Sequence, residues 1–139
     1  MSLVLNKEEL TDYLAEIFPQ IRDDFAVDDL TADTITMRLL TDERHLRPGG
    51  TVSGPSMFAL ADVSVYAMVL ARVGKKALAV TTNCSMDFMR KPESGRDLIA
   101  QCRLLKLGRV LAVGDVLMAS EGSDKPVARA SLTYSIPPR

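Results

Sequence analysis

One acidic residue, Asp62, lies in the middle of an apolar segment that runs from Ser56 to Val73. A helix over this segment, at about 100° per residue, would surround Asp62 with apolar residues, and no basic residue lies three or four positions away. Burying an unpaired ionised carboxylate costs several kcal/mol. We therefore expect Asp62 to face a cavity or a partner surface, where it could act as a general base or a nucleophile. The structural alternative is an aspartate that caps a backbone group or pairs with an arginine across a subunit interface.

The turn before this segment contains Gly49, Gly50 and Gly54 and leads into Pro55, which favours a helix start. A backbone N–H in the first helical turn has no intrahelical acceptor, so the Gly54 N–H is a candidate donor to a developing oxyanion. The alternative role of Gly54 is to supply the turn geometry before Pro55. Because Pro55 has no N–H, two successive donors cannot form here. Ser53 could add a hydroxyl donor or cap the helix, and we favour the cap.

Two further polar residues precede this turn. Arg47 could bind a substrate carboxylate or phosphate, could pair with Asp62 or with an acid of a partner, or could simply be solvated. His45 is the sole histidine and follows Glu43 and Arg44 in a polar loop. We predict that His45 is exposed and is not a catalytic base.

Hydrophobic periodicity and turn residues predict the elements that position these groups. An amphipathic helix over residues 6–18, capped by Asn6 and ended by Pro19, precedes two strands, the central helix and four long strands. Short turns make the four strands antiparallel neighbours, and a sheet of this size can curl around the apolar helix. The prediction is a single α+β domain over residues 1–139, with the following parts: an N-terminal helix in 1–20, two strands and the loop that holds the site in 21–54, the central helix in 55–74, and four antiparallel strands in 77–136.

The first of the four long strands, residues 77–90, alternates apolar and polar side chains. The alternation predicts one face with Val80, Thr82, Cys84, Met86 and Phe88, and an opposite polar face that includes Asn83. Thr82 or Asn83 could hold a water or a substrate, although strand alternation alone also explains both residues.

Length and composition bound the class of protein. The chain has 139 residues, 47% hydrophobic and 25% charged, which is ordinary for one globular domain. A net charge of −1 gives no argument for nucleic acid or an anionic membrane. Cys84 and Cys102 have no metal-ligand spacing and indicate reduced core residues, so we predict a cytoplasmic protein without a metal site. The N-terminus lacks the pattern of a signal peptide, and Asp62 argues against a membrane span.

The central stretch resembles PaaI-type hotdog thioesterases of the 4-hydroxybenzoyl-CoA thioesterase superfamily. Their usual pattern is N-P-x-G-x-x-H-G-G followed by L-x-D, and the matching residues here are RPGGTVSGP (47–55) and Leu60-Ala61-Asp62. The family's T-x-x-x-x-x-x-F-x-R-P run is similar to the stretch from Thr81 to Pro92, with Lys91 inserted before the proline. Leu107-Gly108-Arg109 resembles the family's G-R hairpin. The resemblance covers about residues 33–136.

The resemblance implies a hotdog fold, in which a curled antiparallel sheet wraps a long central helix, and an acyl-CoA thioesterase. The apolar residues Met57, Phe58, Tyr66, Met86 and Phe88 suggest a small or medium, uncharged acyl group. It places Asp62 on the catalytic carboxylate and the active site between two subunits of a homodimer, which can pair again into a tetramer. Coenzyme A would enter only as part of the substrate. The residues that would contact the substrate form three groups: Thr82 and Asn83 near the acyl pocket or thioester; Arg90, Lys91, Lys106 and Arg109 near the CoA phosphates; and Met57, Phe58 and Tyr66 in the acyl pocket. The four basic residues flank hairpin turns, and the alternative is that they are edge charges that discourage aggregation.

Three residues depart from the family pattern, because Arg47 replaces Asn, Ser53 replaces His and Pro55 replaces the second Gly. These changes lie in the loop that helps the family bind the thioester carbonyl. They motivate a second hypothesis, a hotdog protein that binds acyl-CoA or acyl-lipid without hydrolysing it. A hotdog hydratase, which usually needs an Asp-His pair, is a third and weaker hypothesis because His45 is the only histidine.

Overall fold

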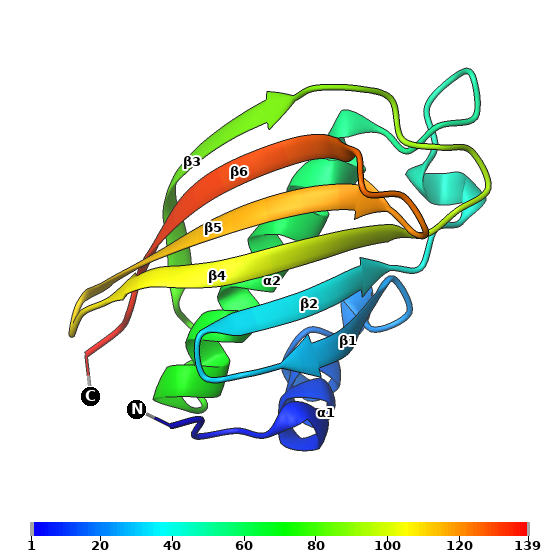
Figure 1. The fold of residues 1–139 in the computed structure, drawn as a ribbon. Helices are drawn as coiled ribbons and strands as arrows, with labels where there is room; N and C mark the ends of the chain where they lie inside the picture. The colour runs from blue at the N-terminus through cyan, green and yellow to red at the C-terminus, as the bar shows by residue number, and fades with distance from the viewer. Residues whose placement is uncertain (1, 139) are drawn as a thin grey trace.

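The computed structural model describes residues 2–138, which form two α-helices, two short 3₁₀ turns and six strands (Figure 1). The strands form one antiparallel sheet in the order β1-β2-β4-β5-β6-β3. In chain order the elements are α1 (Lys7–Ile17), η1 (Pro19–Ile21), β1 (Phe25–Leu30), β2 (Thr34–Leu39), η2 (Glu43–His45), α2 (Gly54–Val73), β3 (Val80–Phe88), β4 (Leu98–Leu107), β5 (Leu111–Ser120) and β6 (Pro126–Ser135).

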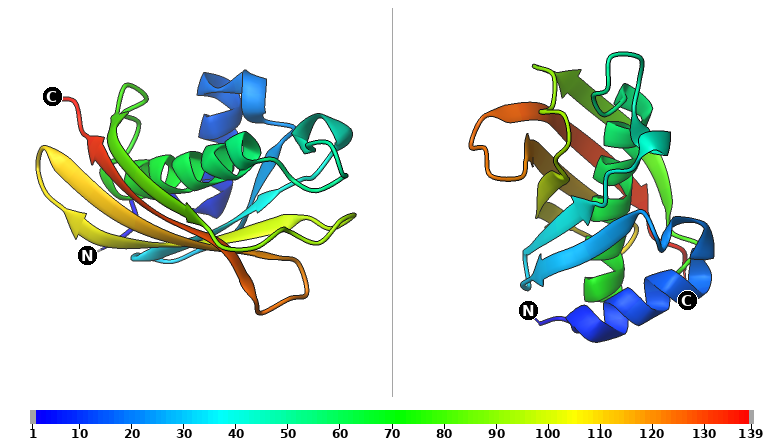
Figure 2. Two further views of the ribbon diagram at one scale, coloured as in Figure 1. Left: turned by 90° about the horizontal axis from the view of Figure 1, so that it is seen from above. Right: turned by 90° about the vertical axis from the view of Figure 1, so that its right-hand side faces the viewer.

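The sheet curls, and α2 lies along its concave face (Figure 2). Every residue from Val63 to Arg72 is buried, as expected for a helix that is apolar on nearly every side. The closest approach is at Gly114 of β5, where an added Cβ would lie 2.9 Å from a methyl carbon of Val65. The predicted fold, a long central helix wrapped by an antiparallel sheet, is confirmed. The prediction that all four long strands are successive neighbours is wrong for β3, which pairs with β6 at the sheet edge, whereas β4 lies between β2 and β5. The segment between β3 and β4 therefore crosses the sheet and is not a hairpin turn.

Helix α2 is long and apolar enough to cross a membrane when judged by length and hydropathy alone. However, 61% of its most apolar window is buried inside the protein. Core helices pass the same test, so these properties of α2 are those of a helix enclosed by its own sheet.

Strand β3 forms one edge of the sheet and contains a bulge between Thr81 and Asn83. Because a bulge adds one residue to one strand, it reverses the inward and outward alternation on either side of it. Thr81 and Cys84 are therefore half-buried, whereas Val80 and Thr82 are exposed. The predicted apolar face that grouped Val80, Thr82 and Cys84 is wrong for this reason.

The N-terminal helix α1 packs on β1 and α2 (Figure 2). Its start is fixed by a capping box in which the Asn6 side chain accepts from the Glu9 N–H and the Glu9 side chain accepts from the Asn6 N–H. Leu10 and Leu14 face the core. Phe18, at the C-terminal end of α1, remains partly exposed beside α2.

Candidate active site

Asp62 is half-buried in the middle of α2 and faces β3 and β6. Its Oδ1 accepts two hydrogen bonds from neutral hydroxyls, at 2.5 Å from Thr81 Oγ1 and at 2.7 Å from Tyr134 Oη. Its Oδ2 has no hydrogen-bond partner among residues 2–138. Two donors that hold one carboxylate oxygen fix the orientation of the group and leave the other oxygen available for chemistry.

The phenol of Tyr134 is a hydrogen-bond donor that stays protonated. Burial and, secondarily, the charge of Asp62 raise the pKa of Tyr134 well above its usual value, so the phenol stays protonated. The same hydroxyl also lies 3.0 Å from the backbone oxygen of Asp62. The nearby Cys84 thiol also has a raised pKa, first because of burial and second because of Asp62, so it is not an activated nucleophile.

A cavity of about 370 Å³ opens beside Asp62. Its walls mix polar and apolar groups in nearly equal measure and come from the end of α1, from α2, from β3 with the segment that leads into it, and from β6. Tyr66 stacks on Tyr134 with ring centroids 5.9 Å apart and donates to the Ala77 backbone oxygen at 2.6 Å. The complete lining is Phe18, Asp62, Val63, Tyr66, Ala77, Ala79, Val80, Thr81 and Tyr134.

The N-terminal end of α2 presents a different set of groups. Ser53 caps the helix by accepting from the Ser56 N–H at 3.3 Å, and Pro55 is the second helical residue. The N–H of Gly54 has no acceptor among the described residues. The hydrogen bonds of the helix begin only with the Met57 N–H, which donates to the Ser53 oxygen, so the N–H groups before Met57 have no acceptor within the helix. The free Gly54 N–H therefore lies at the positive end of the helix dipole.

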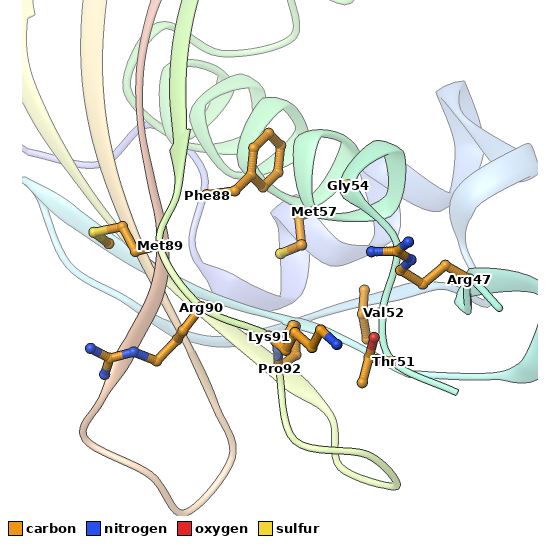
Figure 3. Close-up of a pocket in the computed structure, with 10 residues that line it drawn as sticks. All are labelled: Arg47, Thr51, Val52, Gly54, Met57, Phe88, Met89, Arg90, Lys91 and Pro92. Atoms are coloured by element: carbon orange, nitrogen blue, oxygen red, sulfur yellow. The ribbon is translucent and has the colours of Figure 1, made fainter. Parts of the chain in front are cut away.

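A second cavity of about 320 Å³ lies at this end of the helix (Figure 3). Three cationic residues line it, and no carboxylate does among residues 2–138. Figure 3 shows the Arg47 guanidinium near Gly54 and the Lys91 side chain beside Thr51 and Val52, whereas the guanidinium of Arg90 extends away from Gly54. Arg47 makes no ion pair with Asp62 or with any other described acid. The full lining is Arg47, Thr51, Val52, Gly54, Met57, Phe88, Met89, Arg90, Lys91 and Pro92.

The two cavities are separate within one protomer. Gly54 and Asp62 are eight positions apart on one helix, or about 12 Å along its axis at 1.5 Å per residue. The cavities share no lining residue. One protomer therefore cannot bring its own Asp62 and Gly54 to the same carbonyl group.

The remaining predicted substrate residues are distributed over the molecule. Thr82 and Asn83 are exposed on β3, and Thr82 bonds the Thr133 backbone oxygen at 3.3 Å. Lys106 and Arg109 lie at the β4–β5 hairpin, at the opposite end of the sheet from the loop before α2 (Figure 1). Of the predicted acyl-pocket residues, Met57 lines the Gly54 cavity, Tyr66 lines the Asp62 cavity, and Phe58 is 40% exposed outside both.

The predicted exposure of His45 is wrong, because its side chain is buried. Its Nδ1 accepts from the Asp42 N–H at 2.9 Å, so the proton is on Nε2, which donates to Asp24 at 3.1 Å. Its backbone oxygen accepts from the Ser53 N–H at 2.8 Å. His45 thus anchors the loop that carries Arg47 and leads to Gly54, a structural role that excludes it as a catalytic base beside Asp62.

Among residues 2–138, no cluster of three or more histidine, cysteine, aspartate or glutamate side chains could hold a metal ion. Sequence reasoning missed Thr81 and Tyr134, the two residues that contact the Asp62 carboxylate. Thr81 starts the run that resembles the family pattern, which was the one available signal. Nothing in the sequence around Tyr134, which is 72 positions from Asp62, singled it out.

The long helix wrapped by a curled six-stranded sheet, with a carboxylate at mid-helix, defines a hotdog-fold protein. Residues 49–127 match the family model described as the thioesterase superfamily. The chain belongs to this family, and the prediction of a hydrolase that acts on thioester bonds is confirmed.

Three relatives illustrate the match. A candidate thioesterase from Silicibacter sp. TM1040 is 70% identical, with a TM-score of 0.94 over 99% of this chain and 96% of that one. A candidate esterase from Pseudomonas aeruginosa is 32% identical over 74% of this chain and 75% of its own length. The phenylacetic acid degradation protein PaaI from Thermus thermophilus, solved as an N33D mutant, is 26% identical, with a TM-score of 0.73 over 86% and 99%. The predicted resemblance to PaaI-type hotdog proteins is confirmed.

Proposed function

We propose that this protein hydrolyses acyl-CoA thioesters at an active site that two copies of the chain complete. The observation that carries the proposal is the Asp62 carboxylate, whose Oδ1 is held by two neutral hydroxyls and whose Oδ2 is free beside a cavity of about 370 Å³. An oriented carboxylate without a cationic partner has the arrangement that a general base or nucleophile needs.

Two routes use the free Oδ2. As a general base, Asp62 takes a proton from water while the water oxygen attacks the thioester carbon. As a nucleophile, Oδ2 attacks that carbon, the C–S bond breaks, and water then hydrolyses the mixed anhydride. Both routes consume one water and release a carboxylic acid and the free thiol of CoA. Label in the Asp62 side chain after a single turnover in ¹⁸O-labelled water would identify the nucleophilic route with water attack at the Asp62 Cγ, because the general-base route puts the label only in the released acid.

The oxyanion that develops on the thioester carbonyl needs a hydrogen-bond donor. The candidate donor of the same protomer, the Gly54 N–H, is too far from Asp62 to provide it. We propose that the Gly54 N–H of a second copy supplies this donor, because it is unpartnered and lies at a helix N-terminus. Strand β3 supports this pairing because it is a sheet edge with the exposed apolar residues Val80 and Phe88. An exposed apolar edge of this kind favours pairing with another strand. The site is therefore incomplete without a homodimer.

The CoA moiety would lie on the Gly54 side of the site. Arg47, Arg90 and Lys91 line that cavity and suit phosphate groups, and no described carboxylate opposes them. A Streptococcus pneumoniae thioesterase with this fold, 15% identical and with a TM-score of 0.79 over 94% of this chain and 98% of that one, was solved with coenzyme A. The cavity at Asp62, which has no cationic lining residue among residues 2–138 and includes Phe18, Val63 and Val80, would then receive an uncharged acyl group. The free thiols of Cys84 and Cys102 suit a reducing compartment, so we place this activity in the cytoplasm.

A second function, non-hydrolytic binding of acyl-CoA, is favoured by the residues that differ from the family pattern. Ser53 uses its hydroxyl oxygen as the helix cap, and Pro55 has no N–H to give. The carbonyl would thus have fewer donors than the family pattern provides. A hydratase is disfavoured because His45 bonds Asp24 in the loop and lines neither cavity.

Release of free thiol from a panel of short, medium and aromatic acyl-CoAs tests the proposal. Asp62→Asn keeps an oxygen for Thr81 and Tyr134 but cannot accept a proton efficiently, so kcat should fall by about 100- to 10,000-fold with CoA affinity unchanged. The matched control is Asp124→Asn at an exposed turn, which should leave kcat unchanged. Binding of acyl-CoAs without thiol release over the whole panel would favour the non-hydrolytic function.

A further inference from the structure

Val63, the neighbour of Asp62 on α2, separates two cavities. It is 6% exposed and lines both the Asp62 cavity and a second, apolar cavity of about 220 Å³ beneath α1. Among residues 2–138, Val63 is the only lining residue that the two cavities share. The cavity beneath α1 is lined by Thr11, Leu14, Ala15, Ile21, Arg22, Phe25, Ala26, Val27, Met37 and Val63.

The chemistry of the cavity beneath α1 fits a hydrocarbon. Its walls are aliphatic and aromatic side chains from α1, η1, β1 and β2, with Thr11 and Arg22 as the polar exceptions. The Arg22 side chain is 61% exposed and lies near Asp23 at the surface, so its charge remains in water. A charged or strongly polar ligand would leave its groups unsatisfied there.

The direction of the acyl chain follows from Asp62. The reacting carbonyl must lie at Oδ2, and the CoA side is assigned to the cationic cavity at Gly54. Because the Gly54 cavity proposed for CoA belongs to the second copy, the acyl chain would extend along the Asp62 cavity of the first, whose walls include Phe18 and Val63. Any chain that is longer than this cavity meets Val63 before it can reach the apolar space beneath α1.

We infer that Val63 is a specificity-determining residue that sets the longest acyl group the site accepts, and that the cavity beneath α1 is the space into which a longer linear chain would extend. This inference rests on the proposed thioesterase function and adds the acyl-length limit and its position. In this inference a smaller side chain at position 63 opens a passage between two existing cavities, both of which Val63 lines.

The test compares Val63→Ala with wild type on linear acyl-CoAs from acetyl to palmitoyl. The ratio of kcat/KM for dodecanoyl-CoA to that for hexanoyl-CoA should rise by at least about tenfold, because each accommodated methylene contributes to binding. Val63→Phe should shift the ratio the opposite way by a similar factor. The control is Val69→Ala, the same truncation at a fully buried position of α2 that lines neither cavity, and it should leave the ratio within about twofold.

A binding measurement separates failure of this inference from failure of the proposed function. Dodecyl-CoA and hexyl-CoA thioethers cannot be hydrolysed, so their affinities report the pocket alone. Preferential tightening of dodecyl-CoA by Val63→Ala supports the inference even if the wild type releases no thiol from any acyl-CoA. An unchanged dodecyl to hexyl affinity ratio in a folded Val63→Ala variant would overturn the inference, whether or not the enzyme turns over.

Discussion

The Asp62 carboxylate at the middle of α2 has hydrogen-bond partners within its own chain, whereas the Gly54 N–H at the N-terminal end of the helix has none among residues 2–138. In the middle, Asp62 is oriented by Thr81 and Tyr134 of the same chain, and the helix is enclosed by the sheet. At the end, the Gly54 N–H has no acceptor among the described residues, and Arg47 has no ion pair. Folding alone therefore orients the carboxylate, whereas the Gly54 N–H and the Arg47 side chain have no partner among the described residues, as the proposed two-copy site requires.

Removing the two hydroxyls that bond Asp62 should give the largest effect, a loss of kcat. Thr81→Val and Tyr134→Phe each remove one donor to Oδ1, and each should lower kcat by about tenfold, with about 100-fold for the double variant. Steady-state thiol release measures the effect. Thr82→Val is the control, because Thr82 is exposed and bonds only a backbone oxygen across the strand pair. A loss in Thr82→Val as large as that in Thr81→Val would contradict the assignment of the bulge.

Two glycine substitutions test how closely the protein packs around each part of α2: Gly114 of β5 faces the middle of the helix, and Gly54 begins it. Gly114→Ala would place a Cβ 2.9 Å from a Val65 methyl carbon, so we expect a loss of about 2 kcal/mol in the free energy of unfolding. Gly54→Ala would place its Cβ at 3.6 Å from the Phe88 ring, an ordinary contact, and should change stability by less than about 0.5 kcal/mol. Urea titration of both variants gives the comparison. Equal losses would show that the two parts of the helix are packed alike.

The Tyr134 phenol, which is buried and contacts Asp62, should give a smaller effect, which is a dependence of the unfolding free energy on alkaline pH. Because the pKa of Tyr134 is raised in the folded state, its contribution to stability is complete below the unfolded pKa of about 10 and is lost as the pH rises above that value. Tyr134→Phe should therefore flatten the alkaline decline in unfolding free energy. Chemical denaturation between pH 9 and about pH 11 measures this slope. The same slope in wild type and variant would mean that Tyr134 ionises normally in the folded protein.

The parts of the molecule that rest on local patterns could be predicted from the sequence. The all-round apolar segment at residues 56–73 predicts an enclosed helix, and the turn residues between long alternating segments predict an antiparallel sheet. The role of Ser53 as a helix cap is also local, because it depends on the three residues that follow. The position of Asp62 within the apolar segment was sufficient to single it out as the candidate catalytic residue.

The parts that depend on distant contacts could not be predicted. A bulge in β3 turns Thr81 rather than Thr82 inward, and no residue type in that strand marks the bulge. Tyr134 reaches Asp62 only because β6 lies next to β3 in the sheet. His45 is buried and its Nε2 donates a hydrogen bond to Asp24, from the segment before β1, and a polar local sequence cannot reveal that contact.

Mixing two inactive variants tests most directly whether Asp62 of one copy works with Gly54 of another. Asp62→Asn removes the carboxylate, and Gly54→Phe fills the cavity at the helix end. In a shared-site dimer formed from equal amounts of both, one site of each mixed pair contains an intact Asp62 and an intact Gly54 end. Statistical exchange should then restore about a quarter of wild-type thiol release from two preparations that are each inactive. Mixed dimers that form, as shown by co-purification through two different tags, but recover no activity would contradict the account.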